Sequence, residues 1–132
     1  MAQFGVKGFD DIIQALDRLG RIDEIGPKML LEAVPILEKE VIKQAMPHKK
    51  TGAMVKSIKS SGIQKSKRLG YMVVVRPRGK DKRGVRNMDK AEWLEFGVKG
   101  RPASPFLTTA VLNATPAVLA KMREVFNREV GG

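Results

Sequence analysis

Hydrophobic residues recur at three- and four-residue steps near the start of the chain, and this spacing places them on one side of a helix. The stripe consists of Phe9, Ile12, Ile13, Leu16 and Leu19. Acidic residues at positions 10 and 11 occupy the first turn, where they suit the positive end of the helix dipole. Gly20 follows and can adopt the left-handed conformation that closes a helix, so we expect a first amphipathic helix here.

A second apolar stripe continues on a single helical face until Pro47 stops it. Its members are Leu30, Val34, Leu37, Val41 and Ala45. We expect Pro27 to open this helix, because the first helical position does not need an amide hydrogen. Pro35 removes one backbone hydrogen bond, so we expect a kink there or two abutting segments.

After Pro47 the helical spacing gives way to short patterns. The apolar residues at 54, 55 and 58 suit either one helical turn or a short strand, and their period does not decide between them. Further on, Tyr71, Val73 and Val75 fall on one face of an extended segment. Residues 68–70 supply a turn that leads back to Ile63, so we predict an antiparallel hairpin.

Residues 77–90 have too few apolar side chains to order themselves around a packed core. They carry basic residues, two glycines and only two hydrophobic residues. A connection of this length in a small domain is usually functional or disordered. We therefore predict a mobile basic loop over about residues 77–90, whose order depends on a partner.

The densest aromatic cluster of the chain lies at Ala91, Trp93, Leu94 and Phe96. We predict a short strand or helical turn there that joins the core. Trp93 and Phe96 are interpreted as core residues rather than as residues that stack on a ligand.

The last part of the chain begins with a helix start signal, in which Ser104 caps a helix whose first residue is Pro105. Apolar residues then recur at helical spacing to the end: Phe106, Leu107, Ala110, Val111, Ala114, Leu119, Met122, Val125 and Phe126. Thr115 and Pro116 repeat the cap-and-proline pair. We therefore expect the C-terminal helix to be kinked or divided at that point.

A chain of 132 residues predicts a single domain over residues 1–132, and 42% hydrophobic residues supply its core without disulfides. The absence of cysteine excludes a disulfide scaffold and a thiol nucleophile, and one histidine excludes a multi-histidine metal site. The opening residues lack a basic stretch followed by an apolar run, and no long apolar window occurs. We expect neither a secretion signal nor a membrane span.

Positive charge is concentrated in the middle of the chain. The sequence has 25 Lys and Arg against 14 Asp and Glu, and 17 of these basic but only 4 of the acidic residues lie between Lys43 and Arg101. This asymmetry favours a polyanionic neighbour, either nucleic acid or an acidic protein surface. The alternative is a solvated basic face with no partner. One hypothesis assigns eight residues to a polyanion-facing or assembly surface with backbone contacts only: Lys49, Lys50, Arg76, Arg78, Lys80, Lys82, Arg83 and Arg86.

The sequence offers little catalytic chemistry. His48 is interpreted as a surface turn residue rather than a catalytic one, and Glu92 and Glu95 as solvent-facing charges that balance the basic middle. The serine-rich stretch 57–61 has no adjacent histidine to act as its base. No Gly-Lys-Ser or Gly-Lys-Thr sequence forms a phosphate loop. We expect no enzyme activity, no metal and no cofactor.

Three short motifs stand out along the chain: a Thr-Gly-x-hydrophobe-x-x-Ser-Ile element at 51–58, an aromatic-Glu-Phe-Gly element at 93–97 and a Pro-Phe-Leu helix start at 105–107. Together they resemble a known phage family, the gene-product-ten-like family of HK-type tailed phages. The motif residues are Thr51, Gly52, Ser57, Ile58, Trp93, Glu95, Phe96, Gly97, Pro105, Phe106 and Leu107. Members of this family serve as head-to-tail connector or tail-completion proteins.

The resemblance implies an α+β fold in which a small antiparallel sheet packs against the N-terminal and C-terminal helices. It also implies a non-enzymatic structural protein of a tailed phage or prophage, made in the host bacterial cytoplasm and located at the head–tail junction of the virion. The implied partners are further copies in a ring, portal or connector and tail proteins, and packaged DNA in non-specific contact, with no membrane. The alternative is a free-standing basic nucleic-acid-binding or nuclease-like protein.

Overall fold

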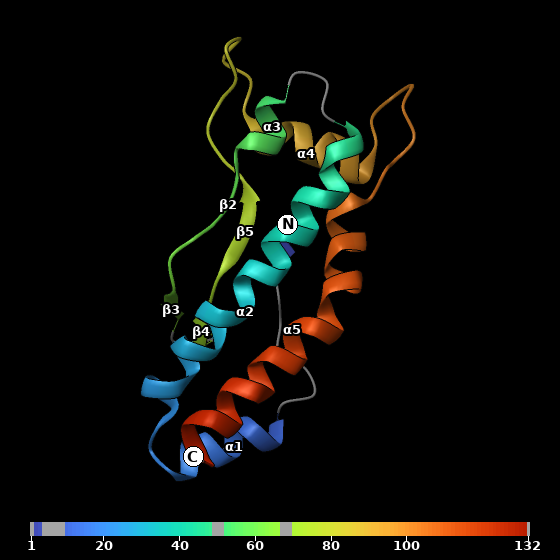
Figure 1. The fold of residues 1–132 in the computed structure, drawn as a ribbon. Coiled ribbons are helices and arrows are strands. Elements are labelled where there is room, and N and C mark those ends of the chain that lie inside the picture. Colours follow the sequence, from blue (N-terminus) through green and yellow to red (C-terminus); the bar gives the residue numbers. More distant parts are fainter. Residues whose placement is uncertain (1, 4–9, 49–51, 67–69, 132) are drawn as a thin grey trace.

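Two long antiparallel helices form the spine of an elongated molecule (Figure 1). They are α2 (Ile22–Ala45) and α5 (Phe106–Val130). The computed structural model describes residues 2–3, 10–48, 52–66 and 70–131. Helix α1 (Asp10–Arg18) precedes α2, and the chain turns between them at Gly20, whose φ is +67°. The predicted first helix and its glycine stop are therefore confirmed.

The seam between α2 and α5 repeats every four residues on both helices. Its buried side chains are Ile25, Met29, Ala33, Leu37, Val41 and Ala45 on α2, and Phe106, Ala110, Ala114, Val118 and Met122 on α5. Rows of side chains at four-residue steps form ridges that fit into the grooves of a neighbouring helix. Alanines at four of these positions let the two backbones approach closely.

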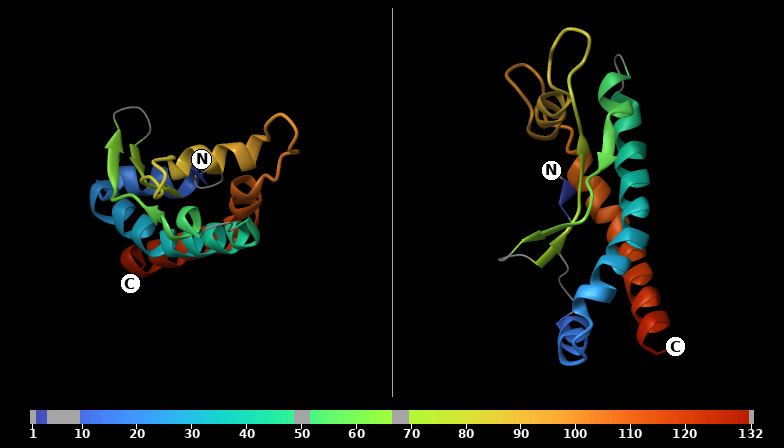
Figure 2. Two further views of the ribbon diagram at one scale, coloured as in Figure 1. Left: turned by 90° about the horizontal axis from the view of Figure 1, so that it is seen from above. Right: turned by 90° about the vertical axis from the view of Figure 1, so that its left-hand side faces the viewer.

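Helix α2 runs from Ile22 to Ala45 without a break, so it includes both Pro27 and Pro35. The prediction that Pro27 opens the helix is wrong, and so is the alternative of two abutting segments at Pro35. The carbonyl that lacks a partner because of Pro35 belongs to Leu31, which lies on the exposed side of the helix, where water can satisfy it. Figure 2 shows that the axis of α2 turns in its first half.

One long bent hairpin supplies most of the strands. The strands are β1 (Ala2–Gln3), β2 (Ile58–Ser60), β3 (Gln64–Ser66), β4 (Gly70–Met72) and β5 (Val74–Pro77). Strands β3 and β4 pair antiparallel near the tip with Lys65 opposite Tyr71, which confirms the predicted hairpin. The remaining three form an antiparallel sheet in the order β1-β5-β2.

The sheet lies against one side of the two long helices (Figure 2). Val73 and Val75 are buried, as the alternation predicts. Tyr71 ties the hairpin to α2, because its hydroxyl donates to Asp23 Oδ1 at 2.5 Å and Lys65 pairs with the same oxygen at 3.2 Å. The α+β fold, with a small antiparallel sheet on the N-terminal and C-terminal helices, is confirmed.

Three short elements stand at the end of the body where α2 finishes and α5 begins. They are the 3-10 turn η1 (Met46–His48) and the helices α3 (Ala53–Lys56) and α4 (Asn87–Phe96). The segment left open at 54–58 contains both alternatives, a helical turn followed by a strand from Ile58. The loop predicted over 77–90 ends at Arg86, because residues 87–90 form the first turn of α4.

Helix α4 buries Asn87, Met88, Ala91 and Glu95 and exposes its aromatic side chains. Ala91 and Glu95 are buried, whereas Trp93 is 50% and Phe96 is 75% exposed. The interpretation of Trp93 and Phe96 as core residues is therefore wrong. On a helix, positions 88, 91 and 95 share one face, and positions 93 and 96 lie on another, so the face that meets the body excludes both rings.

Helix α5 is continuous from Phe106 to Val130 and contains Pro116. Figure 1 shows its axis bending in the upper half, which agrees with the predicted kink and not with a divided helix. Pro116 cannot donate to the carbonyl one turn earlier. The hydroxyl of Thr115 donates to Val111 O at 2.6 Å, so a side chain takes part in the hydrogen bonding of that turn.

The α2–α5 seam predicts the effect of truncating its leucine. Leu37→Ala is expected to lower the free energy of unfolding by about 2–5 kcal/mol, because Leu37 is 2% exposed and a cavity would remain. The matched control is Leu31→Ala in the same helix, where the leucine is 62% exposed, and a change within about 0.5 kcal/mol is expected. Denaturant unfolding followed by circular dichroism measures both, and equal effects would contradict this seam.

Candidate functional site

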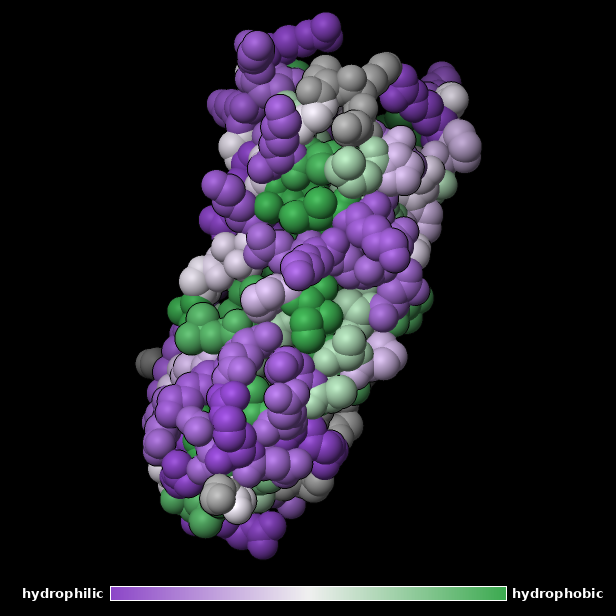
Figure 3. All heavy atoms as spheres, viewed as in Figure 1, coloured by the Kyte–Doolittle hydropathy of each residue, from purple (hydrophilic) through white to green (hydrophobic). Residues whose placement is uncertain are grey.

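One end of the body gathers most of the motif residues and the basic loop. We call it the loop end and define it as α3, residues 78–86, α4 and residues 97–105. In Figures 1 and 2, residues 78–86 and residues 97–105 extend beyond the spine on either side of α4. Figure 3 shows hydrophilic residues at the outer tips of this end and hydrophobic residues exposed just below them.

The carboxylate of Glu95 is buried inside the loop end and caps helix α5. It accepts hydrogen bonds from Leu107 N at 3.1 Å, Thr108 N at 2.9 Å and Thr108 Oγ1 at 2.5 Å. Unpaired amides and the positive end of a helix dipole stabilise a negative charge in this position. The prediction that Ser104 caps α5 is wrong. The residue at the cap position is Pro105, and the side chain that accepts hydrogen bonds from the first amides of the helix is that of Glu95.

Glu95 also corrects the interpretation of two solvent-facing glutamates. Glu92 is exposed as predicted, but Glu95 is only 5% exposed. A cap that comes from a different helix leaves no local sequence signal, because capping patterns are recognised within one turn of a helix start. The cap joins the Glu-Phe-Gly element to the Pro-Phe-Leu element, because Glu95 accepts from Leu107 N.

Gly97 completes the joint between these two elements. Its φ is +81°, and an added Cβ would lie 3.0 Å from Ala103 N and 3.1 Å from Arg101 O. Ser104 N donates to Leu94 O at 2.6 Å across the same turn. The connection from α4 to α5 is therefore closed by backbone contacts that a larger residue than glycine would disturb.

The Ser-Ile element joins α3 to the sheet. Ser57 Oγ donates to Met54 O at 2.7 Å and accepts from Arg78 N at 3.2 Å, and Ile58 is buried. Gly52 has a φ of +80° at the start of α3, whereas Thr51 lies outside the described residues. The contacts of these motif residues are therefore with the backbone and the core of the protein.

A single carboxylate organises the basic loop. Asp81 Oδ1 accepts from Arg83 N at 2.8 Å and Val85 N at 3.0 Å, and Lys90 Nζ lies 2.5 Å from Asp81 Oδ2. The hydrogen bond from Lys90, followed by that from Val85 N, holds the pKa of Asp81 below its ordinary value. Asn87 closes the base of the loop, since its Nδ2 donates to Arg78 O at 2.8 Å.

The structure brings most of the predicted cationic residues together at the loop end. Arg78, Lys80, Lys82, Arg83 and Arg86 are exposed in the loop, and Arg76 is half-buried in β5. Lys49 and Lys50 lie outside the described residues. Arg86 is 4.0 Å from Asp89, and within the described parts of the chain the side chains of the other four loop cations form no ion pair.

Charges at the opposite end are paired with one another. The pairs are Arg21 with Glu24, Lys28 with Glu129, Lys65 with Asp23 and Arg128 with Glu32. Each pair lowers the pKa of its carboxylate, chiefly through a hydrogen bond to the basic partner except at Asp23, where the hydrogen bond from Tyr71 ranks first. The positive potential of the protein is therefore concentrated at the loop end.

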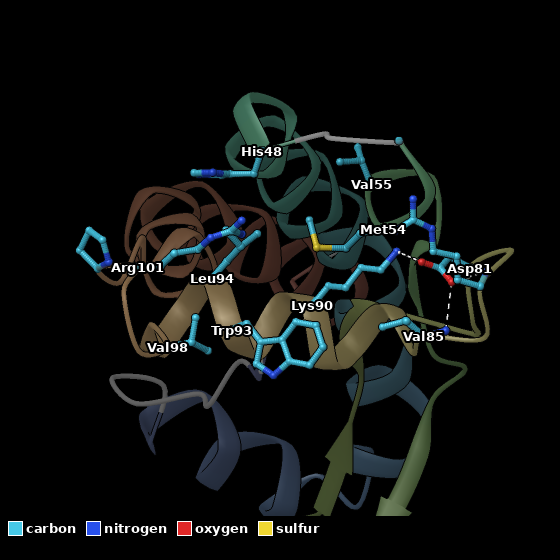
Figure 4. Close-up of a pocket in the computed structure, with 13 residues that line it drawn as sticks. His48, Met54, Val55, Asp81, Val85, Lys90, Trp93, Leu94, Val98 and Arg101 are labelled. Carbon is cyan, nitrogen blue, oxygen red and sulfur yellow. Dashed lines mark hydrogen bonds and ion pairs between the residues drawn. The ribbon is translucent and has the colours of Figure 1, made fainter.

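An open pocket of about 390 Å³ lies between the two loops of this end (Figure 4). The side of residues 78–86 contributes Asp81, Arg83 and Val85. The remaining lining residues are His48, Gly52, Met54, Val55, Lys90, Trp93, Leu94, Val98, Arg101 and Pro102. Distant parts of the chain meet here, so the pocket has no signal in the sequence.

The titratable side chains that line the pocket include one histidine and one ion pair. His48, interpreted as a surface turn residue, is half-buried at its edge, with its ring centroid 6.2 Å from that of Phe106. Asp81 and Lys90 are engaged with each other. Within the described ranges no group of three or more His, Cys, Asp or Glu residues is placed to hold a metal ion. None of the described helices is long and apolar enough to cross a membrane.

The Glu95 cap predicts a large effect from a small change. Glu95→Gln is expected to lower the free energy of unfolding by about 1–3 kcal/mol, because a neutral amide accepts more weakly and leaves a buried amide poorly satisfied. Glu92→Gln, on the exposed side of the same helix, is the matched control and is expected to change little. Thermal and denaturant unfolding measure both variants. An unchanged free energy of unfolding in Glu95→Gln would exclude the cap as a stabilising contact.

The Asp81 turn predicts a pH-dependent loop. Because the folded pKa of Asp81 lies below its ordinary value of 3.8, its stabilising contribution is present above that value and is lost as pH falls through the folded pKa. Hydrogen-exchange protection of Arg83 N and Val85 N should follow this course, disappear in Asp81→Ala and persist in Asp89→Ala. Rapid exchange at every pH would support the mobile loop predicted from the sequence.

Comparison with known proteins gives one match. The family model described as "Bacteriophage HK97-gp10, putative tail-component" matches residues 10–97, two thirds of the chain, from α1 to the glycine after α4. No curated protein and no solved structure matches. The resemblance to this family is thereby confirmed over residues 10–97, and the Pro-Phe-Leu element at 105–107 lies outside the match. The chain belongs to the HK97 gp10-like family of phage tail components.

Proposed function

We propose that the protein is a non-enzymatic structural subunit that joins head and tail of a tailed phage or prophage, as a connector, tail-completion or neck ring subunit. Family membership supports a tail component that contacts other virion proteins. The observation that carries the finer proposal is the loop end. There, cations that have no ion pair within the described residues lie near exposed aromatic side chains, and the hydrogen bonds of Glu95 hold α4 against α5.

The use of the carboxylates supports a structural role. General acid–base chemistry needs a titratable group that faces a substrate. At the loop end, Asp81 is occupied by two backbone amides and Lys90, and Glu95 by the start of α5. Both serve the architecture of the loops, which favours docking over bond making.

The difference between the two ends of the molecule supports assembly into a ring. A ring closes when each copy offers two different surfaces that meet around a rotation axis. The elongated body has two ends of different character, one with paired charges and one with unpaired cations. Partners in this proposal are neighbouring copies, portal or connector proteins and tail proteins at the head–tail junction, after synthesis in the host cytoplasm.

Contact with packaged DNA is the second part of the proposal. Cations that lack internal partners gain affinity for phosphate by releasing counterions, without reading the base sequence. The same cations support the alternative of a free-standing nucleic-acid-binding or nuclease-like protein. The two candidates differ in whether the protein recognises a virion.

Negative-stain microscopy with portal-bearing capsids of the encoding phage tests the proposal. The purified protein is expected to decorate the portal vertex, and capsids without a portal serve as the control. Salt-sensitive binding to duplex DNA together with bare portal vertices would favour the alternative. Decoration spread over the whole capsid would exclude specific joining.

A further inference from the structure

The pocket of the loop end carries exposed apolar surface that a free-standing monomer usually avoids. Trp93 lines it and is half exposed, and Val98 from the neighbouring loop is also exposed. Phe96 follows Trp93 by three residues on α4, so the two rings are neighbours on the helix surface. Aromatic side chains are enriched in the centres of protein–protein interfaces.

The pocket is built to hold its shape. Lys90 on α4 fixes Asp81, and Asp81 in turn fixes the backbone at Arg83 and Val85, which line one side. The other side follows the Gly97 turn, which closes on Ala103. A volume of about 390 Å³ lies near the lower limit of ligand pockets, which suits one or two inserted side chains.

Cations surround this apolar surface from both sides. Arg83 and Arg101 line the pocket, and Lys82 and Lys99 are exposed beside them. Within the described residues none of these four side chains is in an ion pair, whereas Asp81 is already matched by Lys90. Exposed Glu92 and half-buried Asp89 offset only part of this charge. The rim therefore has unmatched positive charge.

We propose that this pocket docks an acidic segment of another virion protein, which inserts an apolar side chain beside Trp93 and lays its carboxylates over Arg83 and Arg101. That the partner is a virion protein rests on the proposed function. The acidic and apolar character of the partner segment rests on the pocket alone. A duplex phosphate backbone would use the cations but leave the apolar pocket empty. An acidic protein segment with an apolar side chain matches both the pocket and the cations around it.

Intrinsic fluorescence tests this directly, because Trp93 is the only tryptophan of the chain. The probe is a short synthetic peptide of Asp and Glu with two central leucines. It is expected to shift the Trp93 emission to shorter wavelength in a saturable manner that weakens with added salt. Replacing its leucines by serines should weaken binding about tenfold or more, and replacing its acidic residues by lysines should abolish it.

Variants of the protein locate the binding site. Arg83→Glu with Arg101→Glu, and separately Val98→Ser, should each weaken peptide binding about tenfold or more. These side chains are exposed, so the folded state is expected to persist, as circular dichroism would verify. Arg18→Glu, an exposed arginine at the opposite end, is the matched control and should leave binding unchanged.

Three results would overturn the inference. They are equal affinity for the leucine and serine peptides, no effect of the paired arginine reversals, and a stronger fluorescence response to single-stranded DNA than to the acidic peptide. Decoration of the portal vertex without peptide binding would overturn this inference alone. Peptide binding without decoration would support this inference and count against the proposed function, so the two failures are distinguishable.

Discussion

The arrangement of the loop end depends on the buried carboxylate of Glu95. A buried charge is costly unless hydrogen bonds replace its hydration, and the first amides of α5 supply them at 2.9 and 3.1 Å. This contact fixes α4 against the start of α5. It thereby sets the position of Trp93, two residues earlier on α4, and of the loop that returns through Gly97. Both sides of the pocket depend on this joint.

The two ends of the body differ in how their charges are paired. At the end that holds α1, acidic and basic side chains from α2, α5 and the hairpin neutralise one another across elements. At the loop end, most cations have no partner in the described chain, and the carboxylates of Asp81 and Glu95 are used in a turn and a cap. Unmatched like charges repel and lower stability, and a polyanionic neighbour would offset this repulsion.

Periodicity and turn chemistry were enough to predict the long helices and the hairpin, because these depend on local spacing. The α+β fold was expected from the resemblance to the phage family. The errors have a common physical origin in contacts between distant segments. Pro27 meets the local preference for a helix start, but α2 already begins at Ile22. The burial of Glu95 has no local signal, because its partners lie on another helix. The pocket was missed since its lining comes from four separate segments.

The reversed burial on α4 is the clearest link between fold and function. Transfer of apolar surface from water favours burying a tryptophan over an alanine, yet α4 buries Ala91 and exposes Trp93. Helical periodicity alone does not require this arrangement, because a rotation of α4 by one residue position would turn Leu94 or Phe96 toward the body. Glu95 must face α5 to cap it, and this requirement fixes the phase and turns the aromatic face outward. A stabilising contact inside the protein thus creates the apolar surface that, together with the neighbouring cations, is available to a partner.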